Sequence, residues 1–237
     1  MAPNSDIDST NLRVLAVIPA YNEQETLAAT VEELVGACPH IDYLVVNDGS
    51  TDDTEKICRE LGLNHVTHPF NTGLSSGFRT GMKYAHAHGY DAVVQFDADG
   101  QHRPECLDVM AERLDQTGCD LVLGSRYLAG EKALGMRNVG SRLLRWLIRR
   151  TTGVTVTDPT SGLRMYGRRM IGLFADGFDL GPEPDTIALL IRNGASVEEV
   201  PITIRERQGG ESYLNPFRAA RYMFRMCASL VLFQWFR

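Results

Sequence analysis

The apolar positions in the first half of the chain alternate between short continuous runs and helical spacing. The runs Val14-Leu-Ala-Val-Ile18 and Ala92-Val-Val-Gln-Phe96 predict buried strands, and Leu27, Val31 and Leu34 share one face of a helix. The expected strands are 14–18, 43–46, 64–67, 92–96 and 121–123, and the expected helices are 24–35, 51–62, 74–88 and 104–115. Strands that alternate with helices predict an α/β fold with a mostly parallel sheet and helices on both faces.

The second half of the chain is less regular. It predicts a helix at 137–150, a turn and strand at 157–166, a helix at 183–192, a strand at 196–204 and a final helix at 216–237, which contains no glycine or proline after Pro216. We therefore expect a disordered tail at 1–11, one domain at 12–212 and a C-terminal amphipathic helix at 213–237.

Charge is distributed unevenly along the chain, which has a net charge of -6. Residues 1–136 hold 9 of the 24 basic residues and 21 of the 30 acidic ones, so the remainder of the chain is basic. This asymmetry indicates an acidic catalytic end and a basic surface for phosphates or an anionic membrane; the alternative is a solvated surface.

Composition excludes several classes of protein. A hydrophobic content of 43% excludes a disordered chain, and five cysteines without a C-x-x-C pair argue against a disulfide framework or zinc cluster and for a reducing compartment. The polar start predicts no secretory signal. No apolar stretch reaches the ~18 to 20 residues of a membrane span; the nearest is 226–236.

Polar clusters follow three of the expected strands. They are Pro19-Ala-Tyr-Asn-Glu23, Asn47-Asp-Gly-Ser50 and Asp97-Ala-Asp99. Ligands of open parallel sheets bind beyond the carboxyl ends of the strands, so this repetition predicts one binding site at that edge.

The third cluster has the chemistry of a cation site. Asp97 and Asp99 can approach one divalent cation, and Gln101 can add a carbonyl oxygen; Mg²⁺ and Mn²⁺ take such oxygen ligands, with substrate phosphate and water completing the shell. The alternative is an ordinary acidic turn before a capped helix.

The ordered set of motifs resembles the family 2 glycosyltransferases of the GT-A fold, and particularly the dolichyl-phosphate mannosyltransferase and polyprenyl-phosphate glycosyltransferase branch. Besides the three clusters, the likeness includes Asn71-Thr-Gly73, Gly124-Ser-Arg-Tyr127, Asp158-Pro-Thr-Ser-Gly-Leu-Arg164, Glu199-Val-Pro-Ile202 and Arg207-Gln-Gly-Gly-Glu-Ser212. It covers residues 14–212.

The resemblance implies a donor site for a nucleoside-diphosphate sugar, with uridine or guanosine as the nucleoside. Asp48 matches the carboxylate that reads the base, Ala98 a backbone contact, and Arg126 and Arg207 the arginines that hold donor phosphate or acceptor. The complete set of implied donor-binding residues is Pro19, Tyr21, Glu23, Val46, Asp48, Asp97, Ala98, Arg126 and Arg207, and the implied metal ligands are Asp97, Asp99 and Gln101. Tyr21 packing on the sheet and Arg126 pairing with an acid are the structural alternatives.

The implied catalytic residues are Asp99 and Asp185, and Asp185 matches the family's acid at the start of a helix. A sugar or lipid hydroxyl acceptor needs a base, for which Asp185 is the first choice and Glu183 the second. A polyprenyl phosphate is already an anion and needs none. Asp185 could instead be an acid favoured by the helix dipole.

One departure from the family pattern concerns the donor clamp. Tyr213 follows Gly-Glu-Ser where the mannosyltransferase branch tends to have lysine, and a phenol brings no positive charge to phosphate. The histidines form no site by spacing, and His102 does not join Asp97 and Asp99 by any spacing rule.

The expected function is therefore inverting transfer of a sugar to a lipid-linked acceptor, with Mg²⁺ or Mn²⁺, at the cytoplasmic face of the membrane. Inversion comes from the family resemblance. A sugar-1-phosphate nucleotidyltransferase would need a glycine-rich loop where Pro19–Glu23 stands, and a non-catalytic nucleotide-sugar-binding partner would not need Asp97, Asp99 and Asp185. P-loop, dinucleotide-binding and hydrolase motifs are absent from the sequence, and nucleic acid is not an expected partner.

The helix at 216–237 is expected to lie in a membrane interface. It has four arginines, no acids and a large apolar set, and the segment 137–150 adds five arginines with Trp146. The alternatives are a core helix and a homodimer interface.

Overall fold

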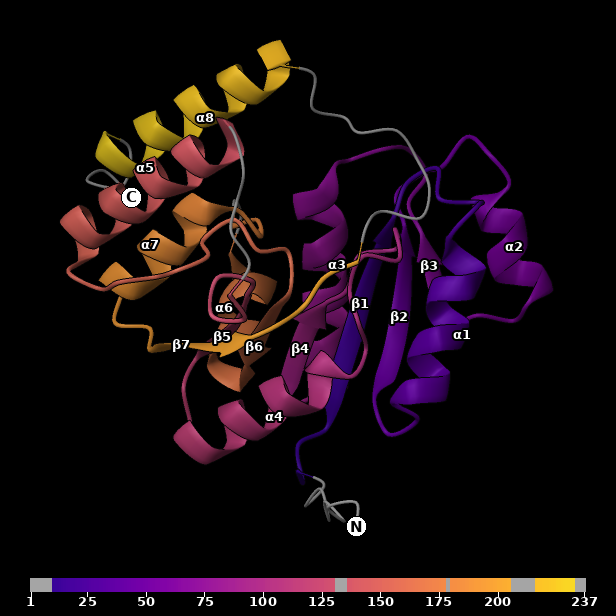
Figure 1. Cartoon of the computed structure of the whole chain (residues 1–237). Helices are drawn as coiled ribbons and strands as arrows, with labels where there is room; N and C mark the ends of the chain where they lie inside the picture. The colour runs from indigo at the N-terminus through magenta and orange to yellow at the C-terminus, as the bar shows by residue number, and fades with distance from the viewer. Residues whose placement is uncertain (1–9, 131–135, 178–179, 206–215, 233–237) are drawn as a thin grey trace.

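Seven strands form one sheet in the order β3-β2-β1-β4-β6-β5-β7 (Figure 1). The computed structural model describes residues 10–130, 136–177, 180–205 and 216–232. The strands are β1 Val14–Ala20, β2 Asp42–Asn47, β3 His65–Thr67, β4 Ala92–Gln95, β5 Leu121–Ser125, β6 Arg164–Gly167 and β7 Val197–Pro201. The helices are α1 Leu27–Ala37, α2 Thr54–Glu60, α3 Leu74–Ala87, α4 Cys106–Thr117, α5 Met136–Thr152, α6 Arg168–Asp176, α7 Pro184–Arg192 and α8 Pro216–Val231.

The sheet is mostly parallel, which confirms the expected α/β class. β1 pairs in parallel with β2 and β4, β2 with β3, and β5 with β7. β6 runs antiparallel to both of its neighbours, β4 and β5, a reversal that the sequence did not predict. Because of it, the loop that enters β6 lies at the same edge of the sheet where the other six strands end.

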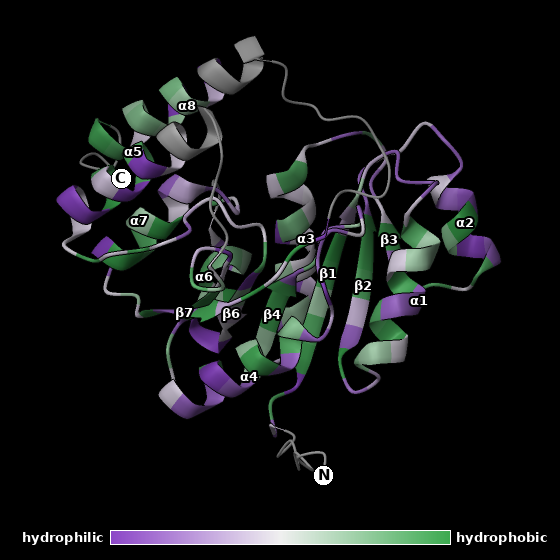
Figure 2. Cartoon of the chain, viewed as in Figure 1, coloured by the Kyte–Doolittle hydropathy of each residue, from purple (hydrophilic) through white to green (hydrophobic). Residues whose placement is uncertain are grey.

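Helices cover both faces of the sheet, and alternate side chains of β1 enter two cores. Ala16 and Ile18 pack in one core with residues of α1 and α4, whereas Leu15 and Val17 pack in the other with residues of α3 and α5 to α8. In Figure 2 most of the central sheet is coloured hydrophobic, whereas the helices carry both hydrophobic and hydrophilic residues. The predicted two-sided burial of the strands is confirmed.

α3 contains two glycines, and Gly81 is needed where the helix packs against β1. A Cβ atom built on Gly81 would lie 2.4 Å from both methyl carbons of Val17 on β1, so only glycine lets the helix approach the strand this closely. α3 spans Leu74–Ala87, which confirms the expected helix at 74–88 to within one residue.

The second half departs most from expectation. α6 was not predicted; it buries Met170, Ile171 and Phe174, and Phe174 packs edge-on against Tyr166 with 5.1 Å between ring centroids. The expected turn and strand at 157–166 is found as a loop followed by β6, and only Arg164–Gly167 pairs with neighbouring strands.

α8 packs along α5 and α7 (Figure 1), and Met226 and Leu230 are fully buried there. One side of α8 thus belongs to the core, as the alternative of a core helix anticipated, and contact of its other side with a membrane stays a prediction. Residues 233–237, with Trp235, and the boundary at 212–213 lie outside the described residues, so the division of domains stays a prediction.

No helix in the described part of the chain is long and apolar enough to cross a membrane.

Candidate functional site

The loops after β1 and β2 are joined by hydrogen bonds at the carboxyl edge of the sheet. Asn22 accepts from the backbone N–H of Thr51 at 2.8 Å, and its own N–H donates to the Ser50 hydroxyl at 3.0 Å. Asn22 has a positive φ of 56°, which asparagine tolerates better than most residues. The first two polar clusters of the sequence thus form one rigid unit, as their places after adjacent strands predict.

An open cavity of about 730 Å³ adjoins this unit. Its lining comes from both loops and from the segment after β3, and comprises Tyr21, Gly49, Ser50, Thr51, Glu55, Arg59, Thr67, His68, Pro69, Phe70 and Asn71. Tyr21 therefore faces the cavity and is placed to contact a ligand there. Gly49 closes the wall tightly, since a Cβ on it would lie 2.4 Å from the backbone carbon of Phe70.

Asp48 is buried behind this wall, and its carboxylate is fully engaged by the protein. Oδ1 accepts from the N–H and hydroxyl of Thr72 at 2.9 and 2.6 Å and lies 2.7 Å from Nδ1 of His68, while Oδ2 accepts from the N–H of Gly73 at 2.7 Å. Burial raises the pKa of Asp48, but these hydrogen bonds outweigh it and hold the pKa below its usual value. Asp48 thus orders the segment that lines the cavity.

The turn after β4 brings Asp97 and Asp99 to the same edge. Asp97 and Asp99 are both partly exposed, and Asp99 Oδ1 accepts from the backbone N–H of Gln101 at 3.1 Å, which fixes the turn. Ala98 is buried, and its carbonyl accepts from the Thr30 hydroxyl on α1 at 3.1 Å. The backbone between the two carboxylates is consequently anchored to the domain.

Two buried polar residues hold Asp97, and sequence reasoning missed both. Gln95 donates its amide to Asp97 Oδ1 at 3.0 Å, and its own carbonyl oxygen is buried without a partner. His102 accepts the backbone N–H of Asp97 on Nδ1 at 3.2 Å, and its Nε2 lies 3.7 Å from Oδ2. Gly162 also lies against Oδ2, where a Cβ would come within 2.9 Å. The i, i+5 relation of Asp97 and His102 around a turn was the available signal.

The donor set fits a hard cation that shares its shell with a substrate. No group of three or more histidine, cysteine or acidic side chains that could hold a metal occurs among the described residues. Two aspartates at a partly exposed turn are the kind of ligands that Mg²⁺ and Mn²⁺ use when substrate phosphate completes their shell.

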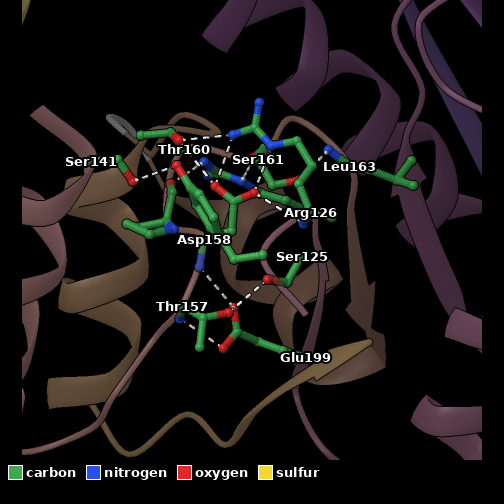
Figure 3. Close-up of polar contacts among 12 residues, drawn as sticks. Ser125, Arg126, Ser141, Thr157, Asp158, Thr160, Ser161, Leu163 and Glu199 are labelled. Atoms are coloured by element: carbon green, nitrogen blue, oxygen red, sulfur yellow. Dashed lines mark hydrogen bonds and ion pairs between the residues drawn. The ribbon is translucent and has the colours of Figure 1, made fainter. Parts of the chain in front are cut away.

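Arg126 pairs with an acid, as the structural alternative anticipated. It directs Nε and Nη2 at the two carboxylate oxygens of Asp158 at 2.7 and 2.8 Å (Figure 3). Asp158 is wholly buried, whereas about a quarter of the Arg126 side chain is exposed. The fork geometry fixes the guanidinium at the carboxyl end of β5.

A second layer of contacts supports this pair from β7. Glu199 accepts from the N–H and hydroxyl of Thr157 at 2.8 and 2.9 Å and from the N–H of Asp158 at 3.0 Å (Figure 3). Ser125 lies 2.6 Å from the Thr157 hydroxyl. The motifs at 124–127, 158–164 and 199–202, which are separate in the sequence, therefore form one polar network.

Arg164 links that network to α7. Its guanidinium is 2% exposed and donates to the carbonyl oxygens of Ser161, Pro159 and Glu183 at 2.8, 3.1 and 3.1 Å. The same loop carries Gly162, which contacts Asp97. A buried cation that binds three carbonyls thus connects the turn at Asp97 to the start of the helix that carries Asp185.

Asp185 lies in the first turn of α7 and contacts the C-terminal helix. Its Oδ2 accepts from the Ser229 hydroxyl on α8 at 2.5 Å. Glu183, the second candidate base, precedes the helix as its N-cap residue and offers its carbonyl to Arg164. The contact between Asp185 and α8 has no sequence signal.

The remaining predicted residues fall in three places. Pro19 is the sixth residue of β1 and Glu23 accepts from the Thr26 hydroxyl at 3.0 Å, so both belong to the first loop region. Val46 is fully buried, and it packs in the core with residues of α3. Arg207 and Tyr213 lie outside the described residues.

Comparison with known proteins gives the family of the chain. The family model for glycosyl transferase family 2 matches residues 15–173. The chain belongs to this family. It is 35% identical over 231 residues to a polyprenol monophosphomannose synthase of Mycolicibacterium smegmatis, covering 90% of this chain and 85% of that protein. It is 36% identical over 217 residues to an undecaprenyl-phosphate mannosyltransferase of Micrococcus luteus, covering 86% and 88%.

These relatives place the family 2 chain in the polyprenyl-phosphate glycosyltransferase branch, as the motifs implied. Its fold is that of glucosyl-3-phosphoglycerate synthase from Mycobacterium tuberculosis, solved with Mn²⁺ and UDP-glucose, with a TM-score of 0.71 at 20% identity over 94% of this chain and 80% of that one. The GT-A prediction is confirmed, and the alternative of a nucleotidyltransferase is not supported.

Proposed function

We propose that the protein transfers a sugar from a nucleoside-diphosphate sugar to a polyprenyl phosphate, with inversion at the anomeric carbon. The observation that carries the proposal is the shared carboxyl edge of the sheet, where the loop after β1 carries Tyr21 of the cavity lining and the turn after the neighbouring β4 carries Asp97 and Asp99. The names of the two mycobacterial and micrococcal relatives support the acceptor class, because both describe products or substrates of polyprenyl phosphate type.

The donor nucleotide would occupy the cavity, with its diphosphate toward Asp97 and Asp99. Bound there by Asp97, Asp99 and Gln101, Mg²⁺ or Mn²⁺ would neutralise the charge that develops on the departing diphosphate. Arg126, already oriented by Asp158 and partly exposed, would add a fixed positive charge on the far side of the site. Arg207 is proposed for the same task on the strength of the family resemblance.

The transfer step needs no base when the acceptor is a phosphate. A phosphate oxygen of the lipid attacks the anomeric carbon, the bond from that carbon to the donor diphosphate breaks, and the nucleoside diphosphate leaves as an anion. Attack opposite the leaving group inverts the configuration. With a phosphate acceptor, Asp185 would orient the acceptor or the side chains beside it. It would act as a base only toward a hydroxyl acceptor.

A lipid acceptor lies in a membrane, so the protein needs a surface that contacts the membrane, and the outer faces of α5 and α8 are candidates for it. Arg142, Arg149, Leu143 and Trp146 are exposed on α5, and Trp146 is 60% exposed. Arg221, Arg225, Phe224 and Val231 are exposed on α8, as is Leu232 directly after it, and Phe224 is 76% exposed. Arginines mixed with large apolar side chains are typical of surfaces that enter the headgroup region, so we propose that these two adjacent helices contact an anionic membrane, at its cytoplasmic face.

The test of the proposed function is a transfer assay with defined substrates. GDP-mannose, UDP-glucose and UDP-N-acetylglucosamine, each with Mn²⁺, are offered with undecaprenyl phosphate or with free undecaprenol in detergent. We expect one nucleotide sugar to give a glycosyl phosphate lipid, and no product with the alcohol. Binding of nucleotide sugars without transfer to any lipid would instead identify a non-catalytic binding partner.

A further inference from the structure

An ion pair on α2 faces the cavity. Glu55 and Arg59 lie one helical turn apart, both line the cavity, and Nη2 of Arg59 donates to Oε1 of Glu55. Glu55 is the one acid among the described residues of the lining, and its side chain is 35% exposed. No hydrogen bond from the described residues engages its Oε2 atom. The carboxylate can therefore accept hydrogen bonds from a molecule in the cavity.

Asp48, to which the family resemblance gives the reading of the base, is less accessible to such a molecule. Its side chain is 6% exposed, and it is not among the described residues that line the cavity. Its oxygens already accept from Thr72 and Gly73, and one of them lies 2.7 Å from the His68 ring. A base bound in the cavity would meet the carboxylate of Glu55 and not that of Asp48.

The order of the strands indicates which part of a nucleoside diphosphate reaches the ion pair. Asp97 and Asp99 follow β4, whereas the cavity extends to the segment after β3, three strands away in the sheet. Neighbouring strands are about 4.8 Å apart, so this is roughly 14 Å. The proposed function, on which this inference rests, directs the diphosphate toward Asp97 and Asp99. The base then lies at the β3 end of the sheet, where α2 is found (Figure 1).

Two aromatic residues of the lining provide a surface for a base. Tyr21 and Phe70 both line the cavity, and Phe70 is 66% exposed although it is large and apolar. Aromatic side chains stack on bases of every kind, because every base has a π-face. Stacking here would bind a base without selecting it, so selection depends on the polar groups of the lining.

We propose that the pair of Glu55 and Arg59 reads the base of the donor and selects guanine over uracil. Guanine presents two adjacent donors, N2–H and N1–H, followed by the acceptor O6. The pair offers the complementary order, two carboxylate oxygens beside a guanidinium that has five N–H groups and keeps donors for O6. Uracil presents one donor, N3–H, between two carbonyl oxygens, so one of these oxygens would face the carboxylate without a hydrogen bond.

The proposal is tested by calorimetric binding of GDP, IDP and UDP, each with Mn²⁺, to the full-length protein. IDP keeps N1–H and O6 of GDP and lacks the exocyclic amino group. We expect GDP to bind roughly 10- to 100-fold more tightly than UDP, and IDP to bind about tenfold more weakly than GDP, the worth of a hydrogen bond to a charged group. UDP that binds as tightly as GDP would overturn the proposal, and so would IDP that equals GDP.

The residue is tested with Glu55→Gln, which we expect to weaken GDP to the level of IDP and to leave UDP nearly unchanged. Glu60→Gln is the matched control, because it removes an exposed acid of the same helix with the same change of charge, and it should keep the difference between GDP and IDP. A difference that persists in Glu55→Gln would assign the amino group to another residue and overturn the proposal. The ranking of the three nucleotides in the unmodified protein does not depend on the folding of either variant.

The same measurements separate this proposal from the proposed function. Preference for UDP, together with transfer from a UDP-sugar to undecaprenyl phosphate, would refute the selection of guanine and leave the proposed function intact. Preference for GDP that disappears in Glu55→Gln, without transfer from any nucleotide sugar, would support the reading of the base and contradict the transferase. A protein that binds none of the three nucleotides would contradict both.

Discussion

The two sides of the sheet edge are constructed in different ways. On the side of β1 to β4, each polar cluster follows its own strand, and neighbouring loops bond to each other, as Asn22 does with Ser50 and Thr51. On the side of β5 to β7, the contacts join segments from distant parts of the chain, as Arg126, Asp158 and Glu199 do. The first side depends on strand order, and the second on the Arg126–Asp158 ion pair and the hydrogen bonds around it, so substitutions should affect them differently.

The largest effect is expected from Arg126→Ala, which leaves Asp158 buried and unpaired. Removing one partner of a buried ion pair costs about 3 to 5 kcal/mol of the free energy of unfolding. Urea denaturation measures this cost. Arg113→Ala on the exposed side of α4 is the control, and it should change stability by no more than about 0.5 kcal/mol. Equal stabilities would mean that the Asp158 network does not support the fold, and that Arg126 serves the donor alone.

On the side of β1 to β4, we expect Asp99→Ala to leave the stability of the fold unchanged and to lower the turnover. We expect at least a ~100-fold loss of turnover, comparable to the loss of one strong transition-state charge contact. Turnover at saturating Mn²⁺ measures it, with the exposed Asp115→Ala as control. Full activity of the unmodified protein in excess EDTA would refute the metal assignment.

Substitutions on the outer faces of α5 and α8 sharpen the comparison further, because they leave both polar networks intact. Trp146→Ser with Phe224→Ser should weaken binding to vesicles containing phosphatidylglycerol by roughly tenfold, since each side chain loses part of its ~1.5 to 3 kcal/mol of burial. Sedimentation with vesicles at two salt concentrations is the measurement, and binding should fall as salt rises.

The substitutions are preferable to truncation before α8, because Met226 and Leu230 belong to the core. A double variant that binds vesicles as well as the unmodified protein would contradict the membrane proposal. A change from dimer to monomer in light scattering would instead show that a second copy covers this surface.

The smallest effect is expected from Asp185→Asn. With a polyprenyl phosphate acceptor no proton has to be removed, so the rate should fall less than about tenfold, and binding of the donor should be unchanged. A loss of roughly 10² to 10⁴, the worth of a positioned base, would indicate a hydroxyl acceptor. Ser229→Ala, which removes the contact between α8 and Asp185, is the companion variant.

Strand order explains why part of the site could be predicted. Parallel neighbours end at one edge, so Tyr21, Asp97 and Asp99 could be brought together from their places after expected strands. Gln95 and Arg164 could not, because no periodicity indicates the carboxylate or the carbonyl oxygens that they bind, and for His102 the i, i+5 relation to Asp97 was the available signal. The reversal of β6 escaped prediction for the same reason: an apolar run shows that a strand is buried and says nothing of its direction.

That reversal also has a consequence for how such a sequence can diverge. Because β6 runs backward between β4 and β5, the loop before it touches Asp97 through Gly162 on one side and α7 through Arg164 on the other. An insertion in this short loop would separate the carboxylate turn from α7, so the loop is expected to keep its length when such a sequence diverges.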